Sequence, residues 1–297
     1  MDKAHIKTDK VLNRIEKEIT EGYNKAIKES REELAKVLSN IDTTQDPKKL
    51  YALIQKQKRL DKLINKMTND LQYANKMAID IMNNSFIESY GINYNYTAFD
   101  ITKMSGANID WNLYNKNTIK AILSDNVNPF ELMALDELKD KAVITKLLKR
   151  ELTAGILRGE GINQIAKRIS KVADKKRSDA IRIARTETGR VQNSARLDAM
   201  SYASDKGLNI QKTWSSTLDG RTRHSHVAMN GETVPLNESF SNGLDVPCGS
   251  GGFPADVCNC RCTMITEFVG LEKHAKEIEL NQELKKIEED IFYEKYS

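Results

Sequence analysis

The strongest constraint on the fold is a regular spacing of apolar residues in the first part of the chain. Between residues 50 and 81, apolar side chains recur at alternating steps of three and four residues, with one polar exception. The members of this series are Leu50, Leu53, Gln57, Leu60, Ile64, Met67, Leu71, Ala74, Ala78 and Ile81. A heptad-like spacing of this length predicts one long helix with a narrow apolar seam.

A second long helix is expected before this one. Apolar residues between positions 5 and 40 also recur, mostly at steps of three and four, and Pro47 can open the helix that follows. We expect the two helices to pack as a hairpin, and a partner-binding coiled coil is the alternative. Residues 90–115 are rich in Asn, Tyr and Gly and break the helical period, which predicts a loop or short hairpin.

The middle of the chain, residues 117–206, returns to a helical pattern. Pro129 lies near one expected start, and a glycine at 159 or 161 lies near a stop. A short amphipathic helix is predicted over residues 161–174, and a longer one over residues 176–207.

After Gly207 the pattern changes to short β-like runs, at residues 209–216, 232–236 and 260–269, with a glycine-rich loop at 241–256. The predicted fold is mainly α with a small C-terminal α+β part. It comprises a long N-terminal helical hairpin, amphipathic helices, and a compact short-stranded β unit rich in loops. We expect three regions, 1–115, 116–268 and an acidic helical tail at 269–297.

Composition agrees with long solvated helices. The 297 residues are 39% hydrophobic, 30% charged and only 6% aromatic. No stretch approaches the roughly 18–20 apolar residues of a membrane span, and the polar N-terminus has no apolar signal region. We therefore expect folding in a reducing cytoplasm, where cysteines are free thiols or metal ligands before they are disulfides.

Basic residues are concentrated between positions 139 and 190, with fifteen Lys or Arg against six Asp or Glu. On a helix, Arg182, Arg185 and Arg196 would lie together, about 100° from the apolar face. Such a stripe suits double-stranded DNA, bound through its phosphates without sequence preference. The alternative is a solvated face with local partners, such as Glu187 for Arg190.

The scarce cysteines and half of the histidines fall in one short part of the chain. Cys258, Cys260 and Cys262 would project to one side of a strand. Zinc in structural sites takes four N or S ligands in a tetrahedron, and His226, Cys248, Cys260 and Cys262 could supply them to one structural Zn²⁺. The spacing is not the usual pair of cysteines separated by two residues. Buried thiols that pack a compact β unit, or a late disulfide, are the alternatives.

The same region also contains residue types that occur in catalytic sites. A histidine beside a cysteine could activate a thiol nucleophile, and Asp219, Arg221, Arg223 and His226 could resemble a nuclease cluster. However, no carboxylates are paired as a two-metal phosphodiesterase requires, and residues 219–221 are typical of a tight turn. We predict that the chain has no catalytic residues and is not an enzyme. A nuclease or other phosphodiester-acting enzyme that uses the Arg/His/Cys region is the alternative.

Several motifs occur in a fixed order over about residues 140–268. They are Ala184-Arg185-Thr186-Glu187, Trp214, Asp219-x-Arg221-Thr222-Arg223 with His226, Pro254-Ala255-Asp256, and Asn259-Cys260-Arg261-Cys262. Together they resemble the phage Mu F-like minor head proteins, also called phage head morphogenesis proteins. The resemblance makes residues 116–268 a head morphogenesis domain, whereas residues 1–130 carry no motif of this family.

The resemblance implies a structural protein inside the phage head, near the portal vertex, present in the host cytoplasm during assembly. Its implied partners are the portal protein, the major capsid or scaffolding protein, and packaged DNA, whose delivery into the host some relatives influence. Cys248 and Cys258 are additions to the usual pattern, so the resemblance does not imply a four-ligand metal site. Some relatives are fused to toxin domains such as ADP-ribosyltransferases. We expect none here, because about thirty residues follow the last motif.

Overall fold

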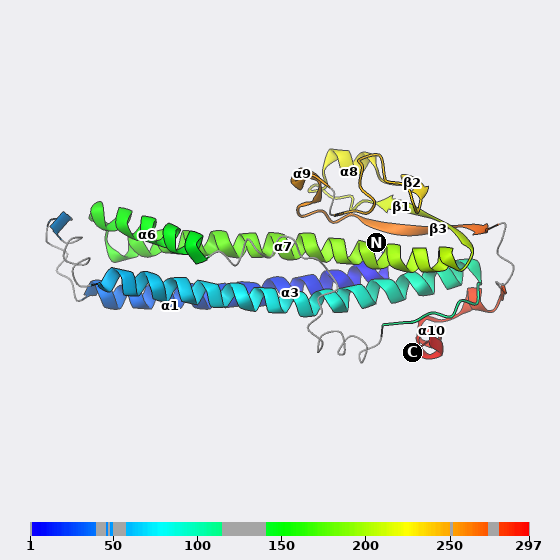
Figure 1. Cartoon of the computed structure of the whole chain (residues 1–297), viewed down its shortest axis with the longest axis horizontal. Helices are drawn as coiled ribbons and strands as arrows, with labels where there is room; N and C mark the ends of the chain where they lie inside the picture. The colour runs from blue at the N-terminus through cyan, green and yellow to red at the C-terminus, as the bar shows by residue number, and fades with distance from the viewer. Residues whose placement is uncertain are drawn as a thin grey trace. The chain divides into compact units, whose positions relative to one another are not determined.

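A computed structural model describes residues 2–39, 46, 48–49, 58–114, 141–249, 252–272 and 279–296. The helices and strands, most of which are labelled in Figure 1, are α1 (Lys3–Ser39), α3 (Arg59–Ser105), α6 (Lys141–Leu157), α7 (Ile162–Asp205), β1 (Leu208–Ser215), α8 (His224–Ala228), β2 (Thr233–Pro235), α9 (Pro254–Val257), β3 (Thr263–Leu271), the 3₁₀ helix η1 (Leu284–Lys286) and α10 (Glu289–Tyr296). The predicted class, mainly α with a small C-terminal α+β part, is confirmed.

The chain divides into two compact units. One, here called the helical unit, comprises residues 14–82 and 132–183. The other, here called the sheet unit, comprises residues 1–13, 83–131 and 184–297. The predicted boundaries at residues 115 and 268 stay predictions.

The helical unit is built from parts of α1, α3, α6 and α7. The predicted seam of α3 is buried at every described position from Leu60 to Ala78, and Ile81 is half-buried. Its earlier members at 50, 53 and 57 lie outside the described residues. Polar contacts join the helices as well: the Tyr23 hydroxyl of α1 donates to Asn75 of α3. The hairpin expected from the apolar spacing is therefore supported by direct α1–α3 contact.

Two predictions about helix boundaries are wrong. The helix α3 continues to Ser105, through most of the stretch expected to be a loop. Tyr90, Tyr94 and Ala98 recur at steps of four and pack into the sheet unit, and this stripe outweighs the Asn- and Gly-rich composition. Likewise, residues 162–205 form one helix and not two. Between residues 162 and 205 there is no proline, and the only glycine is tolerated in the helix.

The sheet unit contains a three-stranded antiparallel sheet in the order β2-β1-β3. In the central pair, Trp214 of β1 lies opposite Met264 of β3. Apolar side chains of this sheet share one core with residues of α3 and α7, including Tyr94, Ala98 and Ala199. The sheet is thereby fixed on the C-terminal part of α7, which positions the motifs described below.

The chain outside the sheet differs in part from expectation. Gly159, at φ +65°, follows α6, as predicted for a helix stop. Strand β3 begins at Thr263, so Cys258, Cys260 and Cys262 do not lie on one strand as predicted. Cys258 instead follows α9, and Asn259 turns the chain with φ +55°. In the tail, β3 extends to Leu271, and residues 289–296 are helical.

Candidate functional site

Two side chains of α7, Gln192 and Asn193, form hydrogen bonds with the start of β3. The Gln192 side chain donates to the Thr263 hydroxyl at 2.9 Å. The side-chain amide of Asn193 donates to the carbonyl oxygen of Cys262 at 3.2 Å, and its Oδ1 accepts from the backbone N–H of Met264 at 3.0 Å. Because both side chains are almost fully buried, these bonds hold the strand in one register on the helix.

The contact between α7 and the start of β3 is here called the junction. Arg196, one turn further along α7, is the charged residue at its centre. Its side chain is only 3% exposed and forms a two-pronged ion pair with Asp2, at 2.7 and 2.9 Å. It also donates to Asn93 of α3 at 3.1 Å and to the carbonyl oxygen of Met264 at 2.8 Å. Burial works to raise the pKa of Asp2, but Arg196 outweighs it and the pKa lies below its ordinary value.

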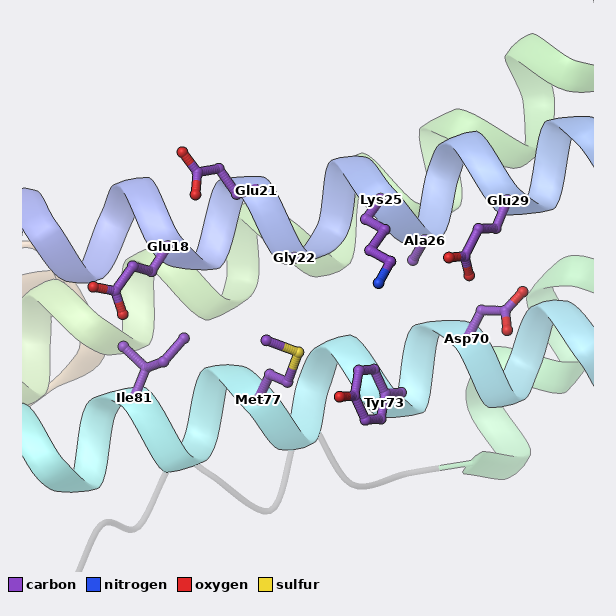
Figure 2. A pocket seen from close by; sticks show the side chains of 10 residues that line it. All are labelled: Glu18, Glu21, Gly22, Lys25, Ala26, Glu29, Asp70, Tyr73, Met77 and Ile81. Atoms are coloured by element: carbon purple, nitrogen blue, oxygen red, sulfur yellow. The ribbon is translucent and has the colours of Figure 1, made fainter.

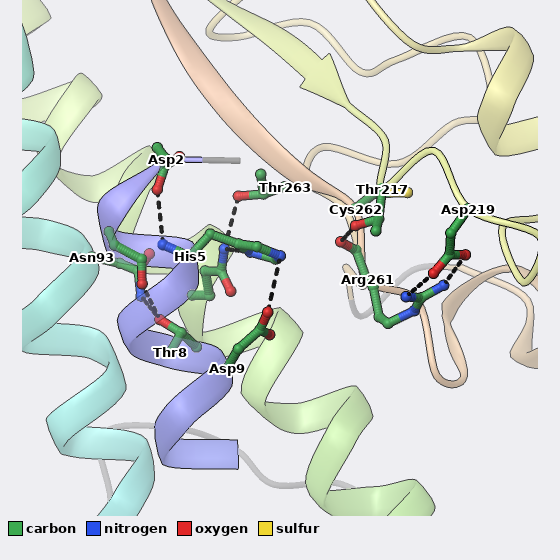
Figure 3. Close-up of polar contacts among 12 residues, drawn as sticks. Asp2, His5, Thr8, Asp9, Asn93, Thr217, Asp219, Arg261, Cys262 and Thr263 are labelled. Carbon is green, nitrogen blue, oxygen red and sulfur yellow. Dashed lines mark hydrogen bonds and ion pairs between the residues drawn. The ribbon is translucent and has the colours of Figure 1, made fainter. Parts of the chain in front are cut away.

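The N-terminal turn of α1 completes the junction (Figure 3). His5 is buried, and its Nδ1 lies 2.7 Å from the Gln192 amide nitrogen. Asp9 lies 3.9 Å from the other ring nitrogen. Burial lowers the pKa of His5 below its ordinary value despite this carboxylate, so the ring is neutral near pH 7.

The Arg-Thr-Glu motif, residues 185–187 near the middle of α7, contacts the cysteine segment. The Thr186 hydroxyl accepts from the backbone N–H of Asn259 at 3.1 Å, which stabilises the left-handed turn there. Glu187 pairs with Arg190, as the local-partner interpretation predicted. Burial raises the pKa of Glu187, although Arg190 opposes that shift.

The Asp-x-Arg-Thr-Arg motif forms a turn that is hydrogen-bonded to the cysteine segment. As predicted for residues 219–221, the chain turns here, and the Thr222 N–H donates to the Asp219 carbonyl at 3.0 Å. Arg261 donates twice to the Asp219 carboxylate, at 2.6 Å each, and holds its pKa well below the usual range (Figure 3). Arg223 donates to the carbonyl oxygen of Cys258 at 2.5 Å, whereas the Arg221 side chain is 79% exposed.

Three of the four predicted metal ligands come together. His226 Nδ1 and the Sγ atoms of Cys260 and Cys262 all lie within 4.8 Å of one another, and all three residues are buried. The fourth, Cys248, is not within that group, and its thiol donates to the Cys260 carbonyl oxygen at 3.4 Å. Trp214 packs its ring edge-on to His226, with centroids 5.4 Å apart. The cluster has the donor types and burial to hold a metal ion.

Without a metal, the two thiols of the cluster are poor nucleophiles. Contact with the neighbouring Cys260 thiol, together with burial, raises the pKa of Cys262 to about 12. Contact with Cys248, together with burial, also raises the pKa of Cys260. Since the thiolate is the reactive form, this arrangement disfavours a thiol nucleophile near neutral pH.

Part of the chain matches a known protein family. Residues 146–265 match the family described as Phage Mu protein F like protein. This segment belongs to the Mu F-like family. The chain is also 25% identical over 262 residues to minor head protein GP7 of Bacillus phage SPP1, across 86% of this chain and 83% of that protein. No solved structure gives a significant match.

A second relative carries a different name. Over 148 residues the chain is 31% identical to NAD(+)--arginine ADP-ribosyltransferase EFV of Enterococcus faecalis. This match covers 49% of the chain but only 30% of that protein. The similarity therefore concerns a limited part of the transferase, and the name by itself assigns no activity to this chain.

The structure changes the expectation for the DNA-contacting arginines. Arg185 is exposed and Arg182 is half-buried, whereas Arg196 is buried in the junction and offers no surface to DNA. The prediction for Arg196 is wrong because its position on the helix faces Asp2 and β3. Elsewhere in the basic region, Arg168 is paired with Glu160 at 2.6 Å. Many of these arginines therefore have acidic partners, as the alternative interpretation expected.

A groove of about 490 Å³ lies between α1 and α3 within the helical unit (Figure 2). Figure 2 shows Tyr73 and Met77 of α3 facing the stretch of α1 that carries Gly22 and Ala26. These small residues leave the aromatic and thioether side chains uncovered, and Tyr73 is 63% exposed. The rim is mainly acidic, formed by Glu18, Glu21, Glu29 and Asp70 with one cation, Lys25.

Sequence reasoning missed the polar residues of the junction. Gln192 and Asn193 lie inside the recognised motif region but are ordinary polar types on a helix, and no spacing marks them as buried. Lys212 was missed for the same reason: it is 1% exposed and its ammonium donates to the carbonyl oxygens of Leu236 and Asp245, at 3.0 and 2.9 Å. Only the strand alternation of β1, which places position 212 on the same face as Trp214, could have indicated it.

Proposed function

We propose that this protein is a minor head protein of a tailed bacteriophage and a structural part of head morphogenesis. The observation that carries the proposal is the similarity to minor head protein GP7 along most of both chains, together with the Mu F-like segment. The geometry supports a structural role, because the motif residues bond to one another across α7, the Asp219 turn and the start of β3. None of the described helices is long and apolar enough to cross a membrane.

Within this role, we place the protein inside the head near the portal vertex, with assembly in the host cytoplasm. It associates with the portal protein and contacts the major capsid or scaffolding protein. The groove between α1 and α3 suits such a contact, because an exposed tyrosine and methionine lie inside an acidic rim. A basic, partly apolar surface on the partner would complement it.

Co-expression with the phage's own portal protein, followed by affinity purification and electron microscopy of the complex, tests this association. The double variant Tyr73→Ser/Met77→Ser should weaken co-purification at least tenfold. The matched control Asn69→Ser/Lys76→Ser changes exposed positions on the same helix outside the groove. A wild-type chain that fails to join the portal or heads refutes the proposal, whereas equal binding by both variants refutes only the groove.

The protein further contacts packaged DNA and aids its delivery into the host. Arg185 is exposed on α7, and lysines at 167, 171 and 175 are exposed earlier on the same helix. Phosphate contacts of this kind predict binding without sequence preference that weakens steeply with salt. Arg185→Gln should reduce the salt dependence of binding to duplex DNA by about one ion. Salt-independent binding, or no binding at low salt, would contradict this part.

The nuclease alternative is not adopted. Among the residues that the structure describes, no carboxylate belongs to the His226 cluster. The nearby Asp219 is occupied by Arg261 in a two-pronged pair. As the cofactor we propose one structural Zn²⁺ at this cluster, with no catalytic part.

A further inference from the structure

The His–Cys cluster has the dimensions of a zinc site. His226 Nδ1 lies 3.5 Å from the Sγ atom of Cys260 and 3.5 Å from that of Cys262. In a tetrahedral site with Zn–N of about 2.0 Å and Zn–S of about 2.3 Å, nitrogen and sulfur ligands lie about 3.5 Å apart. We propose that these three residues bind one Zn²⁺, with Cys248 as the fourth ligand, and that the ion fastens α8 to the start of β3.

The surroundings of the three atoms favour a metal over ordinary hydrogen bonds. All three residues are at most 4% exposed, and Nδ1 of His226 lies within contact distance of both sulfur atoms. The other ring nitrogen, Nε2, is buried without a partner among the described residues. A metal bound at Nδ1 would place the proton of the neutral ring on Nε2. The Cys262 N–H also donates to the Cys260 sulfur at 3.4 Å, a bond that stabilises a thiolate ligand.

Cys248 is the strongest candidate for the fourth ligand. Its backbone lies at φ +65°, a conformation uncommon for residues with a Cβ and often found at functional sites. It packs against Gly189 of α7, where an added Cβ would lie 2.7 Å from the Cys248 sulfur. This packing and the bond to the Cys260 carbonyl keep the thiol beside the cluster. Cys258, which is only half-buried and also lies outside the group of three, provides an internal control.

A metal here would have a clear structural effect. Between β1 and β3, the described chain contains only a five-residue helix, a three-residue strand and a four-residue helix. So little regular structure leaves this connection dependent on side-chain bonds, and a bound Zn²⁺ contributes its binding free energy to folding. The zinc site does not depend on the proposed role in the phage head. Experiments can therefore refute one of these proposals and leave the other standing.

The test uses the full chain purified without chelator. Elemental analysis should find one zinc per chain, and chelator should lower the melting temperature. Co²⁺ added to the stripped protein should give intense thiolate charge-transfer bands, a readout that needs no variant. A metal content near zero, with no binding of added Zn²⁺ or Co²⁺, overturns the site.

Variants then assign the ligands. Cys260→Ser and Cys262→Ser should lose zinc, whereas Cys258→Ser should keep one ion per chain. Cys248→Ser should weaken zinc binding at least tenfold in a competition titration with a coloured chelator. Wild-type affinity in Cys248→Ser overturns the assignment of the fourth ligand, and loss of zinc in Cys258→Ser overturns the ligand set.

Discussion

Replacement of Arg196 by methionine should destabilise the sheet unit more than any exposed change on α7. The guanidinium makes two bonds to Asp2, one to Asn93 and one to the Met264 carbonyl, and the side chain is 3% exposed. Removal of one partner from a buried ion pair costs about 3–5 kcal/mol, because the other charge stays buried and unpaired. Asp2 is 17% exposed, so solvent relieves little of this penalty. We expect a loss of at least about 3 kcal/mol in the free energy of unfolding.

Urea unfolding followed by tryptophan fluorescence measures this loss directly. The chain has two tryptophans, Trp111 and Trp214, and both lie in the core of the sheet unit. The matched control is Arg185→Met, an exposed arginine on the same helix, which should cost less than about 1 kcal/mol.

A double-mutant cycle separates the pair from its surroundings. Asp2→Asn and Arg196→Met together should cost less than the sum of the single changes, because the second change no longer strands a charge. If Arg196→Met unfolds within about 1 kcal/mol of the control, the junction is not held by this pair and the reasoning fails.

Three further predictions concern the same junction. Gly189→Ala should lower stability by about 1–3 kcal/mol, measured by thermal melting, because the new methyl group would overlap the Cys248 sulfur at 2.7 Å; an unchanged melting temperature contradicts the packing. Asn193→Ala should cost about 2–4 kcal/mol in urea unfolding, since it removes the acceptor of the Met264 N–H and a donor to the carbonyl oxygens of Pro247 and Cys262. The lowered pKa of His5 means that the unfolded state takes up protons first, so stability should fall as pH drops below about 6.5. His5→Gln should flatten this part of the stability–pH curve, and an identical slope would exclude His5 as its cause.

The sequence by itself determined the buried face of the N-terminal helices and the family match of residues 146–265. Apolar spacing fixes which side of a helix must be buried, so the seam positions from Leu60 to Ala78 could be predicted correctly from the sequence. The short strands and the turn at residues 219–221 also followed from local pattern, because alternation and turn chemistry act over a few residues.

The tertiary structure decided that α3 continues to Ser105 and that α7 is unbroken. It also decided which polar residues are buried and which are exposed. Whether an arginine meets solvent or a buried carboxylate depends on what packs against its helix, and Asp2 lies 194 residues away from Arg196 in the chain. The same holds for the cluster: local spacing placed three cysteines on one strand. Only the folded chain turns at Asn259, sets Cys258 aside, and brings His226 to the other two thiols. Long-range contacts of this kind leave no periodic trace in a single sequence, because no local geometry relates the two partners.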